Sequence, residues 1–435
     1  MKIRVIFICL SVFLFSWNLH AFSEQSEATA TPTCIPLKQI SVKKAMNFEI
    51  QIGEELETFT NRENNYVFIG KSDTLKNGNF DVLVVKTDAG GKIMWKKYFG
   101  EAEDDWGIDI IAAADGYVFA GSSGDKPFMA KIDEMGKLLW YKTFNEKIKE
   151  GYFTSITVNP AGDIVATGQI DDENDDNEKV FIVKMNSAGE EVKRESFIGT
   201  HTKSARGYKI AFISENKYLV SGNLWKNGLL FSMDEDLNPI NTITMNNKGI
   251  DEGLRLETVY SGNAGDSIRD WGYVRCAELH DFVDVNDNIF AIAILDGEDF
   301  APMQRYLMKF EKFTPKKGYL YSTLCRNFDM RSICKTANRD IFVSGDTCKT
   351  SGLFSSCDNV ILNVDSDLNI NCAYSLKVGD YTRVIDMKTC SDGRQIIFGE
   401  FYEKEFREKN KYTSNDETKK KYYIVQTDND FSILK

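Results

Sequence analysis

The sequence predicts an all-β fold, a single β-propeller of about seven four-stranded blades. Two kinds of short strand each recur seven times along the chain, in blocks of roughly 50 residues. Four short strands in such a period are typical of propeller blades. No segment shows a sustained 3.6-residue apolar repeat, which disfavours solenoids that contain a helix in each repeat.

The second strand of each block is the clearest element. It is a short run of β-branched and aromatic residues, and glycine ends it in every copy but the fifth. A run of this composition that glycine cuts off favours a strand over a helix. The copies are Tyr66–Gly70, Tyr117–Gly121, Ile164–Gly168, Tyr218–Gly222, Ile289–Leu295, Ile341–Gly345 and Gln395–Gly399.

The third strand of each block leads into a polar turn. Asp or Asn usually follows the strand, and Gly or Asn comes two or three residues later. The first side chain can cap a tight hairpin and the later residue tolerates positive φ. The seven copies span residues 82–93, 128–138, 181–191, 230–240, 306–320, 361–370 and 423–433.

An aromatic residue opens the first strand of most blocks. Successive gaps run from 46 residues (Trp106 to Tyr152) to 63 residues (Tyr208 to Trp271). We expect these aromatic residues to occupy one equivalent position. The set is Trp106, Tyr152, Tyr208, Trp271, Phe328 and Tyr381.

The ends of the chain suggest how the ring closes. Met46–Gly53 resembles the last strand of a block but precedes the first one, so we expect it to complete or flank the final blade. An insertion, Asn246–Asp270, contains Leu254–Tyr260, a possible extra strand. Eight blades is therefore the alternative count.

The N-terminus predicts export. Lys2 and Arg4 precede an uncharged apolar run at 5–17, and Ala21 offers a cleavage site. The run is shorter than the roughly 20 residues of a membrane span, although an uncleaved anchor is the alternative. We expect a signal peptide at 1–21, an N-terminal segment at 22–44 and a single propeller domain at 45–435. The mature protein would be secreted, at the cell surface or in the periplasm.

Charge limits the partners. Loss of Lys2 and Arg4 with the signal would take the formal charge from −12 to −14. Nucleic acids and anionic membrane surfaces need basic patches, so neither is an expected partner. We also expect no membrane span in the mature chain.

Cysteine usage favours an oxidising compartment. Nine cysteines occur and eight remain after cleavage, an even number that favours disulfides. Cys348 and Cys357 flank the loop between the second and third strands of the sixth block, so they are the first candidate pair. Cys372 and Cys390 are a weaker candidate, with buried free thiols as the alternative. The sequence has no cysteine–histidine cluster of the kind that would predict a metal site.

Two stretches carry a resemblance to a known family. Asp81–Trp95 and Phe128–Trp140 have the form D-x-x-hydrophobic-x-K-hydrophobic-D-x-x-G-x-x-x-W, and Gly100–Asp104 adds a G-x-x-x-D trailer to the first. They resemble bacterial secreted β-propeller repeats and, more distantly, quinoprotein repeats. The resemblance implies the fold; most members have no assigned activity. A quinone site would require adjacent cysteines. The chain has none, so we expect no cofactor.

The candidate ligand-binding residues are the pairs Asp105–Trp106 and Asp270–Trp271. Both lie where a last strand crosses to the next blade, on the face that carries binding loops in propellers, and a tryptophan there can stack on a ligand. The alternative, which we favour, is that these tryptophans wedge between blades. His201 and His280 are interpreted as ordinary loop residues.

These observations predict an exported, non-catalytic propeller that binds or scaffolds a protein or glycan partner. Carboxylates are abundant, so an enzyme that uses channel carboxylates, such as a glycan hydrolase or lyase, is the alternative. No catalytic residue and no metal ligand can be assigned from the sequence.

Overall fold

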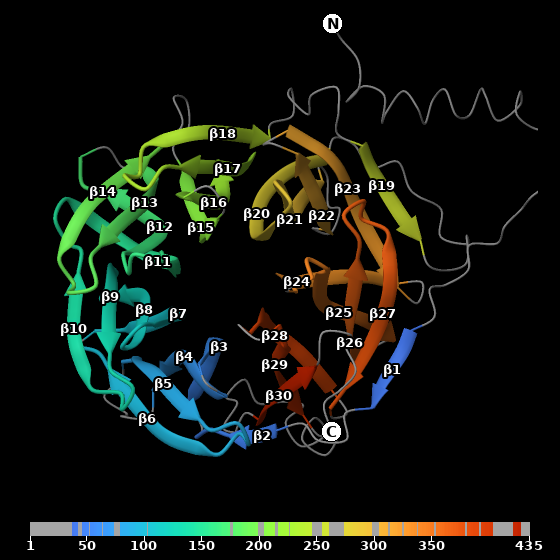
Figure 1. Ribbon diagram of the computed structural model, residues 1–435, viewed down its shortest axis with the longest axis horizontal. Helices are drawn as coiled ribbons and strands as arrows, with labels where there is room; N and C mark the ends of the chain where they lie inside the picture. Colours follow the sequence, from blue (N-terminus) through green and yellow to red (C-terminus); the bar gives the residue numbers. More distant parts are fainter. Residues whose placement is uncertain are drawn as a thin grey trace, which may run out of the picture.

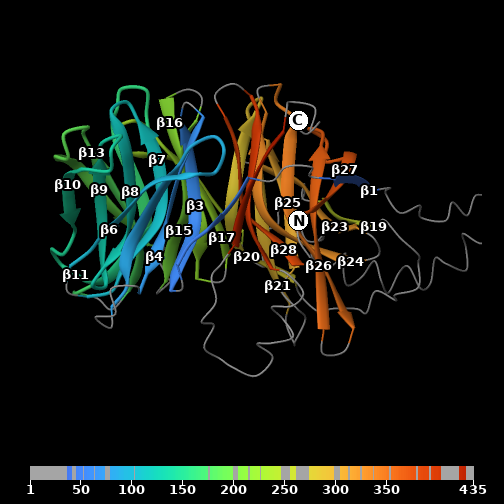
Figure 2. The same cartoon turned by 90° about the horizontal axis from the view of Figure 1, so that it is seen from below.

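The computed structural model describes residues 37–427, except for 42–45, 74–78, 199–203, 246–254, 261–273, 298–303, 403–420 and gaps of one or two residues. Seven four-stranded antiparallel sheets surround a common centre (Figure 1). The strands run between the two faces of the disc (Figure 2). No α-helix occurs in these residues, and so none of them forms a helix that could cross a membrane. The chain is therefore a seven-bladed β-propeller.

Blades 1 to 4 follow the chain without interruption, from inner to outer strand. Blade 1 is β3 (Glu54–Arg62), β4 (Asn65–Ser72), β5 (Asp81–Thr87) and β6 (Ile93–Phe99). Blade 2 is β7 (Asp105–Ala113), β8 (Gly116–Ser123), β9 (Lys126–Ile132) and β10 (Leu138–Thr143). Blade 3 is β11 (Ile148–Val158), β12 (Ile164–Asp172), β13 (Glu178–Met185) and β14 (Glu191–Phe197). Blade 4 is β15 (Ala205–Ile213), β16 (Lys217–Leu224), β17 (Asn227–Met233) and β18 (Pro239–Met245).

Blades 5 and 6 also follow the chain, whereas blade 7 takes its outer strand from the N-terminal part. Blade 5 is β20 (Val274–Val285), β21 (Asn288–Gly297), β22 (Gln304–Glu311) and β23 (Thr314–Thr323). Blade 6 is β24 (Arg326–Lys335), β25 (Ile341–Ser351), β26 (Phe354–Val364) and β27 (Ile370–Lys377). Blade 7 is β28 (Tyr381–Thr389), β29 (Gln395–Tyr402) and β30 (Lys421–Thr427), with β2 (Met46–Glu49) as its outer strand.

The N-terminal strand closes the ring, as predicted. β2 pairs antiparallel with β30, so the first and last parts of the propeller share one sheet (Figure 1). The ring of Phe48 lies 5.0 Å from that of Phe68 in blade 1 and 5.8 Å from that of Tyr422 in blade 7. This packing joins the two ends of the repeat and removes the free edge of blade 7.

Two further strands extend blades 5 and 6 on the outside. β19 (Arg255–Tyr260) pairs parallel with β23, and β1 (Leu37–Ser41) pairs parallel with β27. The possible extra strand is thus an added edge strand, Arg255–Tyr260, and the eight-blade alternative is wrong.

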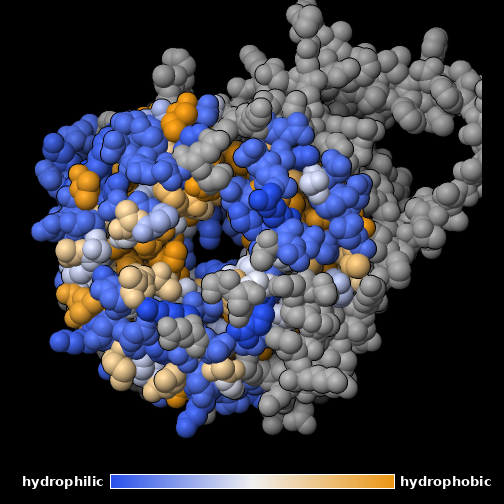
Figure 3. Space-filling model, in the orientation of Figure 1, coloured by the Kyte–Doolittle hydropathy of each residue, from blue (hydrophilic) through white to orange (hydrophobic). Residues whose placement is uncertain are grey.

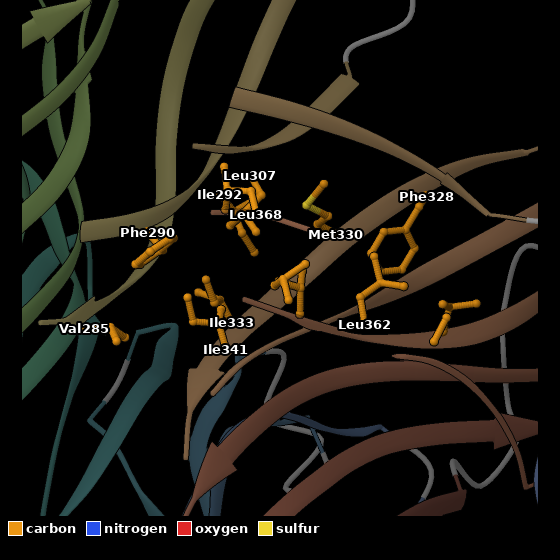
Figure 4. Close-up of a cluster of buried hydrophobic side chains, with 14 residues drawn as sticks. Val285, Phe290, Ile292, Leu307, Phe328, Met330, Ile333, Ile341, Leu362 and Leu368 are labelled. Carbon is orange, nitrogen blue, oxygen red and sulfur yellow. The ribbon is translucent and has the colours of Figure 1, made fainter. Parts of the chain in front are cut away.

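Side chains fill the space between neighbouring blades. Between blades 5 and 6, for example, Phe290 and Leu307 pack in one cluster with Phe328, Ile341 and further apolar residues (Figure 4). Because each sheet buries both faces in this way, the second and third strands are almost continuously buried. This explains why they were the clearest elements in the sequence.

The third-strand lysine of the repeat also joins the blades. Lys86 donates to the carbonyl of Glu134 in the next blade (3.1 Å), and Lys131 donates in the same way to Ser187 (3.0 Å). The K of the sequence motif is therefore a fixed packing element.

The polar turns form as expected, with one correction. The carboxylate or amide oxygen after the third strand accepts two backbone N–H bonds; Asp234 Oδ1, for example, accepts from Asp236 (3.0 Å) and Asn238 (2.8 Å). In this turn and its counterpart in blade 6, however, a buried leucine takes the positive φ, Leu237 (60°) and Leu368 (68°), where we expected Gly or Asn. Asn238 instead donates its side-chain amide back to Asp234 Oδ2 (2.9 Å).

The cysteine predictions have different outcomes. Cys348 and Cys357 are direct partners in the pairing of β25 with β26, within strands that extend beyond them. Their side chains lie outside the described part of the structure, so the bond stays a prediction. The pair Cys372–Cys390 is wrong, because no disulfide joins these two residues in the structure. Cys372 is in an outer strand, whereas Cys390 follows an inner strand and accepts a hydrogen bond from Asn61 in blade 1.

Candidate functional site: the central channel

Seven inner strands line the centre of the disc: β3, β7, β11, β15, β20, β24 and β28 (Figure 1). Each has a β-bulge at the same point, where one residue is skipped in the pairing with the second strand. A bulge changes which side chains point to each face, so it sets what lines the channel. Hydrophilic residues surround a hollow at the middle of the face in Figure 3.

The aromatic residues that we expected at one position do not share it. Relative to the bulge, Trp106 and Tyr152 come two residues earlier, Tyr208 is the bulge residue itself, and Phe328 comes three residues earlier. Tyr381 comes four residues earlier. Trp271 lies outside the described residues. The sequence register was wrong because the loops before the inner strands differ in length.

The residue after each bulge forms what we call the waist ring, one residue per blade. All seven residues are polar or charged. They are Thr58, Asp109, Ser155, Lys209, Asp281, Ser332 and Asp386.

Three aspartates of the waist ring link neighbouring blades. Asp109 Oδ1 accepts from its neighbour Ile110 N (2.9 Å), while Oδ2 accepts from Ile156 N in blade 3 (3.0 Å). Asp281 repeats this arrangement from blade 5 to blade 6, and Asp386 accepts from the Thr58 hydroxyl of blade 1 (2.6 Å). Each carboxylate thus fixes its own bulge and the start of the next blade.

Lys209 is the one cation of the ring. Burial alone would lower its pKa, but Asp109, Asp281 and Asp386 raise it, so the ammonium stays charged. Burial and the charge of Asp386 raise the pKa of Asp281, which Lys209 opposes. Burial also opposes the charged form of Asp386, yet Lys388 and Lys209 hold its pKa below the usual value. The waist ring thus has three aspartates and one lysine, and Lys388 beside Asp386 (3.3 Å) supplies a further cation.

Two cavities lie on opposite sides of the waist. The first, of 310 Å³, is lined by residues that precede the waist on their inner strands, together with Arg305, Glu400 and Tyr422. The second, of 480 Å³, is lined by the waist residues Lys209, Asp281, Ser332 and Asp386 and by residues that follow them. We call the first cavity the arginine pocket, after Arg305, Arg331 and Arg383.

The arginine pocket is formed by blades 5, 6, 7 and 1. Asp329 bridges two guanidinium groups, since its oxygens lie 3.2 Å from Arg305 Nε and 2.7 Å from Arg331 Nη2. Arg383 Nη1 donates to Glu400 (3.2 Å). Glu55 and Glu57 complete the charged lining.

Asp346 lies beside this pocket and is the most perturbed carboxyl there. Arg331 Nε is 3.3 Å from Asp346 Oδ2, whereas Oδ1 is buried without a hydrogen-bond partner. Burial raises the pKa of Asp346 to about 6, although Arg331 and Arg383 oppose the shift. Asp346 is therefore partly protonated near pH 6.

Blades 4 and 5 contribute a second cluster to the channel. His280 is the bulge residue of β20; its ring stacks on Tyr208 at 4.6 Å, and its Nε2 lies 2.5 Å from Glu278. The hydrogen bond from His280 lowers the pKa of Glu278. The interpretation of His280 as a loop residue was wrong. His201 lies outside the described residues.

The residues predicted from the sequence to bind a ligand are only partly described. Asp105 is fully buried, accepts from Glu101 N (2.8 Å) and has its pKa raised by burial, so it anchors a loop between blades 1 and 2. Trp106 is 45% exposed with the Lys71 ammonium 4.9 Å above its ring, which does not fit a wedge between blades. Asp270 and Trp271 lie outside the described residues.

The sequence interpretation missed the three arginines and the waist ring. Alignment of the inner strands on their bulges would have found the waist ring and placed Arg331 and Arg383 near it, because a glycine or an apolar residue precedes each bulge-and-waist pair and an apolar residue follows it. Arg305 is on the third strand of blade 5, so this alignment would not have found it. Leu56 and Phe59 in blade 1 correspond to Met330 and Ile333 in blade 6.

Comparisons with known proteins identify no family. No family model matches the chain, and no curated protein matches it. Among solved structures it is similar to puromycin hydrolase (TM-score 0.49, 11% identity, 86% of this chain and 52% of that one). It is also similar to PorZ, a surface component of the type-IX secretion system of Porphyromonas gingivalis (0.47, 10%, 79% and 45%). A third is a lignostilbene dioxygenase of Pseudomonas brassicacearum (0.48, 11%, 92% and 95%).

The chain spans about half the length of the first two of these proteins. At such identities and TM-scores the likeness carries no argument about function.

Proposed function

We propose that this protein is an exported, non-catalytic propeller that binds a protein or glycan partner at the channel, on the side of the arginine pocket. The observation that carries the proposal is the pocket itself, where charged side chains from four blades line 310 Å³. Fixed polar groups converging on a concave site are what a ligand site needs.

The charged groups of the channel favour binding over proton transfer. The hydrogen bond from His280 lowers the pKa of Glu278, although burial opposes the charged form of this residue. Such carboxylates stay ionised at neutral pH and act as constant hydrogen-bond acceptors. A general acid near neutral pH needs a raised pKa.

A glycan array together with an activity screen on the mature protein tests this proposal. We expect a bound ligand that is recovered unchanged. Release of new reducing ends or unsaturated sugars, abolished by Asp346→Asn, would overturn the non-catalytic role.

The enzyme alternative rests on Asp346. Its raised pKa beside two arginines is typical of a general acid, and it adjoins a pocket that holds a further buried carboxylate, Glu400. A hydrolase or lyase acting on a glycan is the rival that the screen decides.

Export is part of the proposal and has its own test. N-terminal sequencing of the protein recovered outside the cytoplasm should give a chain that begins at Phe22. A chain that retains Met1 would overturn cleavage after Ala21.

A further inference from the structure

The arginine pocket has a dipolar lining that restricts the ligand it can take. Arg305, Arg331 and Arg383 supply the positive groups, and Glu55, Glu57 and Glu400 the negative ones. The two sets balance in number within the lining, and Asp329 and Asp346 add two carboxylates that contact Arg305 and Arg331 from outside it. A dianion such as phosphate would meet three carboxylates, and a cation would meet three guanidinium groups.

Two of the guanidinium groups retain hydrogen-bonding capacity. Arg305 uses Nε on Asp329 and Nη1 on the carbonyl of Met330, while Arg331 uses Nη2 on Asp329 and Nε on Asp346. A guanidinium has five N–H donors, so each can also bind a ligand oxygen. Arginine presents these donors in a planar fork that matches a carboxylate.

One carboxylate holds two of the arginines in place. Asp329 contacts Arg305 and Arg331 through opposite oxygens. Burial lowers the pKa of Arg305 and the charge of Arg331 adds to this, although Asp329, Asp346 and Glu278 oppose the shift. The two guanidinium groups are therefore fixed beside each other before a ligand binds.

The glutamates are suited to hydroxyl donors. An ionised carboxylate only accepts hydrogen bonds, so Glu57 and Glu400 can take ligand O–H or N–H groups but not a second acidic group, and Glu400 also accepts from Arg383. The aromatic ring of Tyr422 contributes the apolar part of the lining. The pocket is near the lower size limit of small-molecule sites, enough for a single sugar rather than a long segment.

We infer that the arginine pocket binds the carboxylate-bearing sugar of an acidic glycan, a uronic acid residue, with its carboxylate on the arginines and its hydroxyls on the glutamates. This inference rests on the proposed function and specifies its ligand class.

Calorimetric titration of the mature full-length chain tests the inference. The probes are short oligomers of galacturonate, glucuronate and mannuronate, each beside its carboxyl-reduced neutral counterpart, and inorganic phosphate. We expect at least one uronide to bind about tenfold or more tightly than its neutral counterpart, because charge-assisted hydrogen bonds are lost on reduction. Phosphate should not compete.

Variants locate the site. Arg305→Gln and Arg383→Gln should each weaken uronide binding about tenfold or more. Arg194→Gln is the matched control, since its guanidinium pairs with Glu191 on the outer strand of blade 3. Circular dichroism and thermal unfolding show whether each variant is folded; if one glutamine variant is not, the other decides.

The outcomes separate the two proposals. Equal affinity for each uronide and its neutral counterpart, competition by phosphate, or unchanged binding in folded Arg305→Gln and Arg383→Gln would overturn the uronide site. Binding of a neutral glycan or a protein would then leave the proposed function standing. Turnover of a glycan would overturn the proposed function instead.

Discussion

Blades 1 to 4 and blades 5 to 7 have the same strand order but differ in what surrounds it. In blades 1 to 3 a buried third-strand lysine donates to a backbone carbonyl in the turn of the next blade. Blades 5 and 6 instead carry added parallel strands, and three arginines from blades 5 to 7 line the pocket. The sequence has no cysteine between Cys34 and Cys276.

This difference separates two kinds of information in the repeat. The residues that recur in these blades, including the motif lysine of blades 1 to 3 and the Asp or Asn of the turn in blades 1 to 4, make contacts within and between blades. The residues that give the channel its candidate site are those in which the blades differ. A repeat motif in such a chain therefore identifies the fold, and the departures from it locate function.

The largest expected effect on stability is where blade 7 meets blade 1, at the closing strand β2. Phe48→Ala removes a buried ring that packs on both blade 1 and blade 7. We expect the free energy of unfolding to fall by about 3–5 kcal/mol, as for other large-to-small changes in a core. Urea denaturation measures it. A loss below about 1 kcal/mol would mean that β2 is an accessory strand and that the two halves hold together without it.

The second prediction tests a position at which the two regions differ in charge. The residue after the second-strand glycine is Ser122, Gln169 or Asn223 in blades 2 to 4, but Asp346 in blade 6. The pKa of Asp346 is about 6 in the folded protein, against about 4 when unfolded. Between these values the folded state holds a proton that the unfolded state has lost, so stability falls as pH rises from about 4 to about 6.

Asp346→Asn, which gives blade 6 the residue of blade 4, should remove that fall. The variant should be more stable than the wild type at pH 7 by at most about 3 kcal/mol and equally stable near pH 3. Chemical denaturation across pH 3–7 checks this, with Asp329→Asn as the control. The same pH dependence in wild type and Asp346→Asn would contradict the assignment.

How far the sequence predicts the molecule depends on register. The second and third strands are buried on both faces, so composition alone identifies them, and the closing strand follows from a surplus segment at the start. The lining of the channel depends on bulges, and a shift of one residue moves a side chain to the other face. His280 was therefore placed in a loop, and the arginines were not singled out.

The wrong cysteine pair had a related cause. Strand order predicts correctly that Cys372 and Cys390 lie towards the same face of the disc, because each is next to a strand end on that side. It does not give their distance from the centre, and one is on an outer strand while the other follows an inner one. Cys348 and Cys357 avoid this problem because they face each other in one hairpin.

The third prediction concerns the two cysteines in the hairpin of blade 6. The corresponding hairpins of blades 1 to 4 contain no cysteine. We expect a Cys348–Cys357 disulfide in the exported protein, which should stabilise it by about 2–3 kcal/mol through closure of a short loop. Mass spectrometry of unreduced tryptic peptides detects the bond. The double variant Cys348→Ser, Cys357→Ser should lose that stability, whereas Cys372→Ser should not. If the two peptides are found unlinked and alkylatable, the bond is absent.

The smallest expected effect compares the same lysine in the two regions. Lys131 in blade 2 donates to the carbonyl of Ser187 (3.0 Å) and lies 2.8 Å from Asp115. Lys309 in blade 5 is buried to a similar degree, but among the described residues its ammonium pairs with the exposed carboxylates of Glu311 (3.3 Å) and Asp367 (3.6 Å). Exposed carboxylates are solvated when the lysine is removed, whereas the carbonyl within the blade interface loses its donor.

Lys131→Met should therefore lower the free energy of unfolding by about 1–2 kcal/mol, and Lys309→Met by about 0.5 kcal/mol or less. Methionine keeps the aliphatic stem in place, so the comparison isolates the ammonium contacts. The exposed Lys137→Met is the control for a change of charge alone. Urea denaturation of the three variants measures these changes in unfolding free energy. Equal losses of unfolding free energy at Lys131 and Lys309 would show that the lysine stabilises the interface by its charge and not by the carbonyl bond. The contrast between the two regions would then rest on the added strands and the arginine pocket.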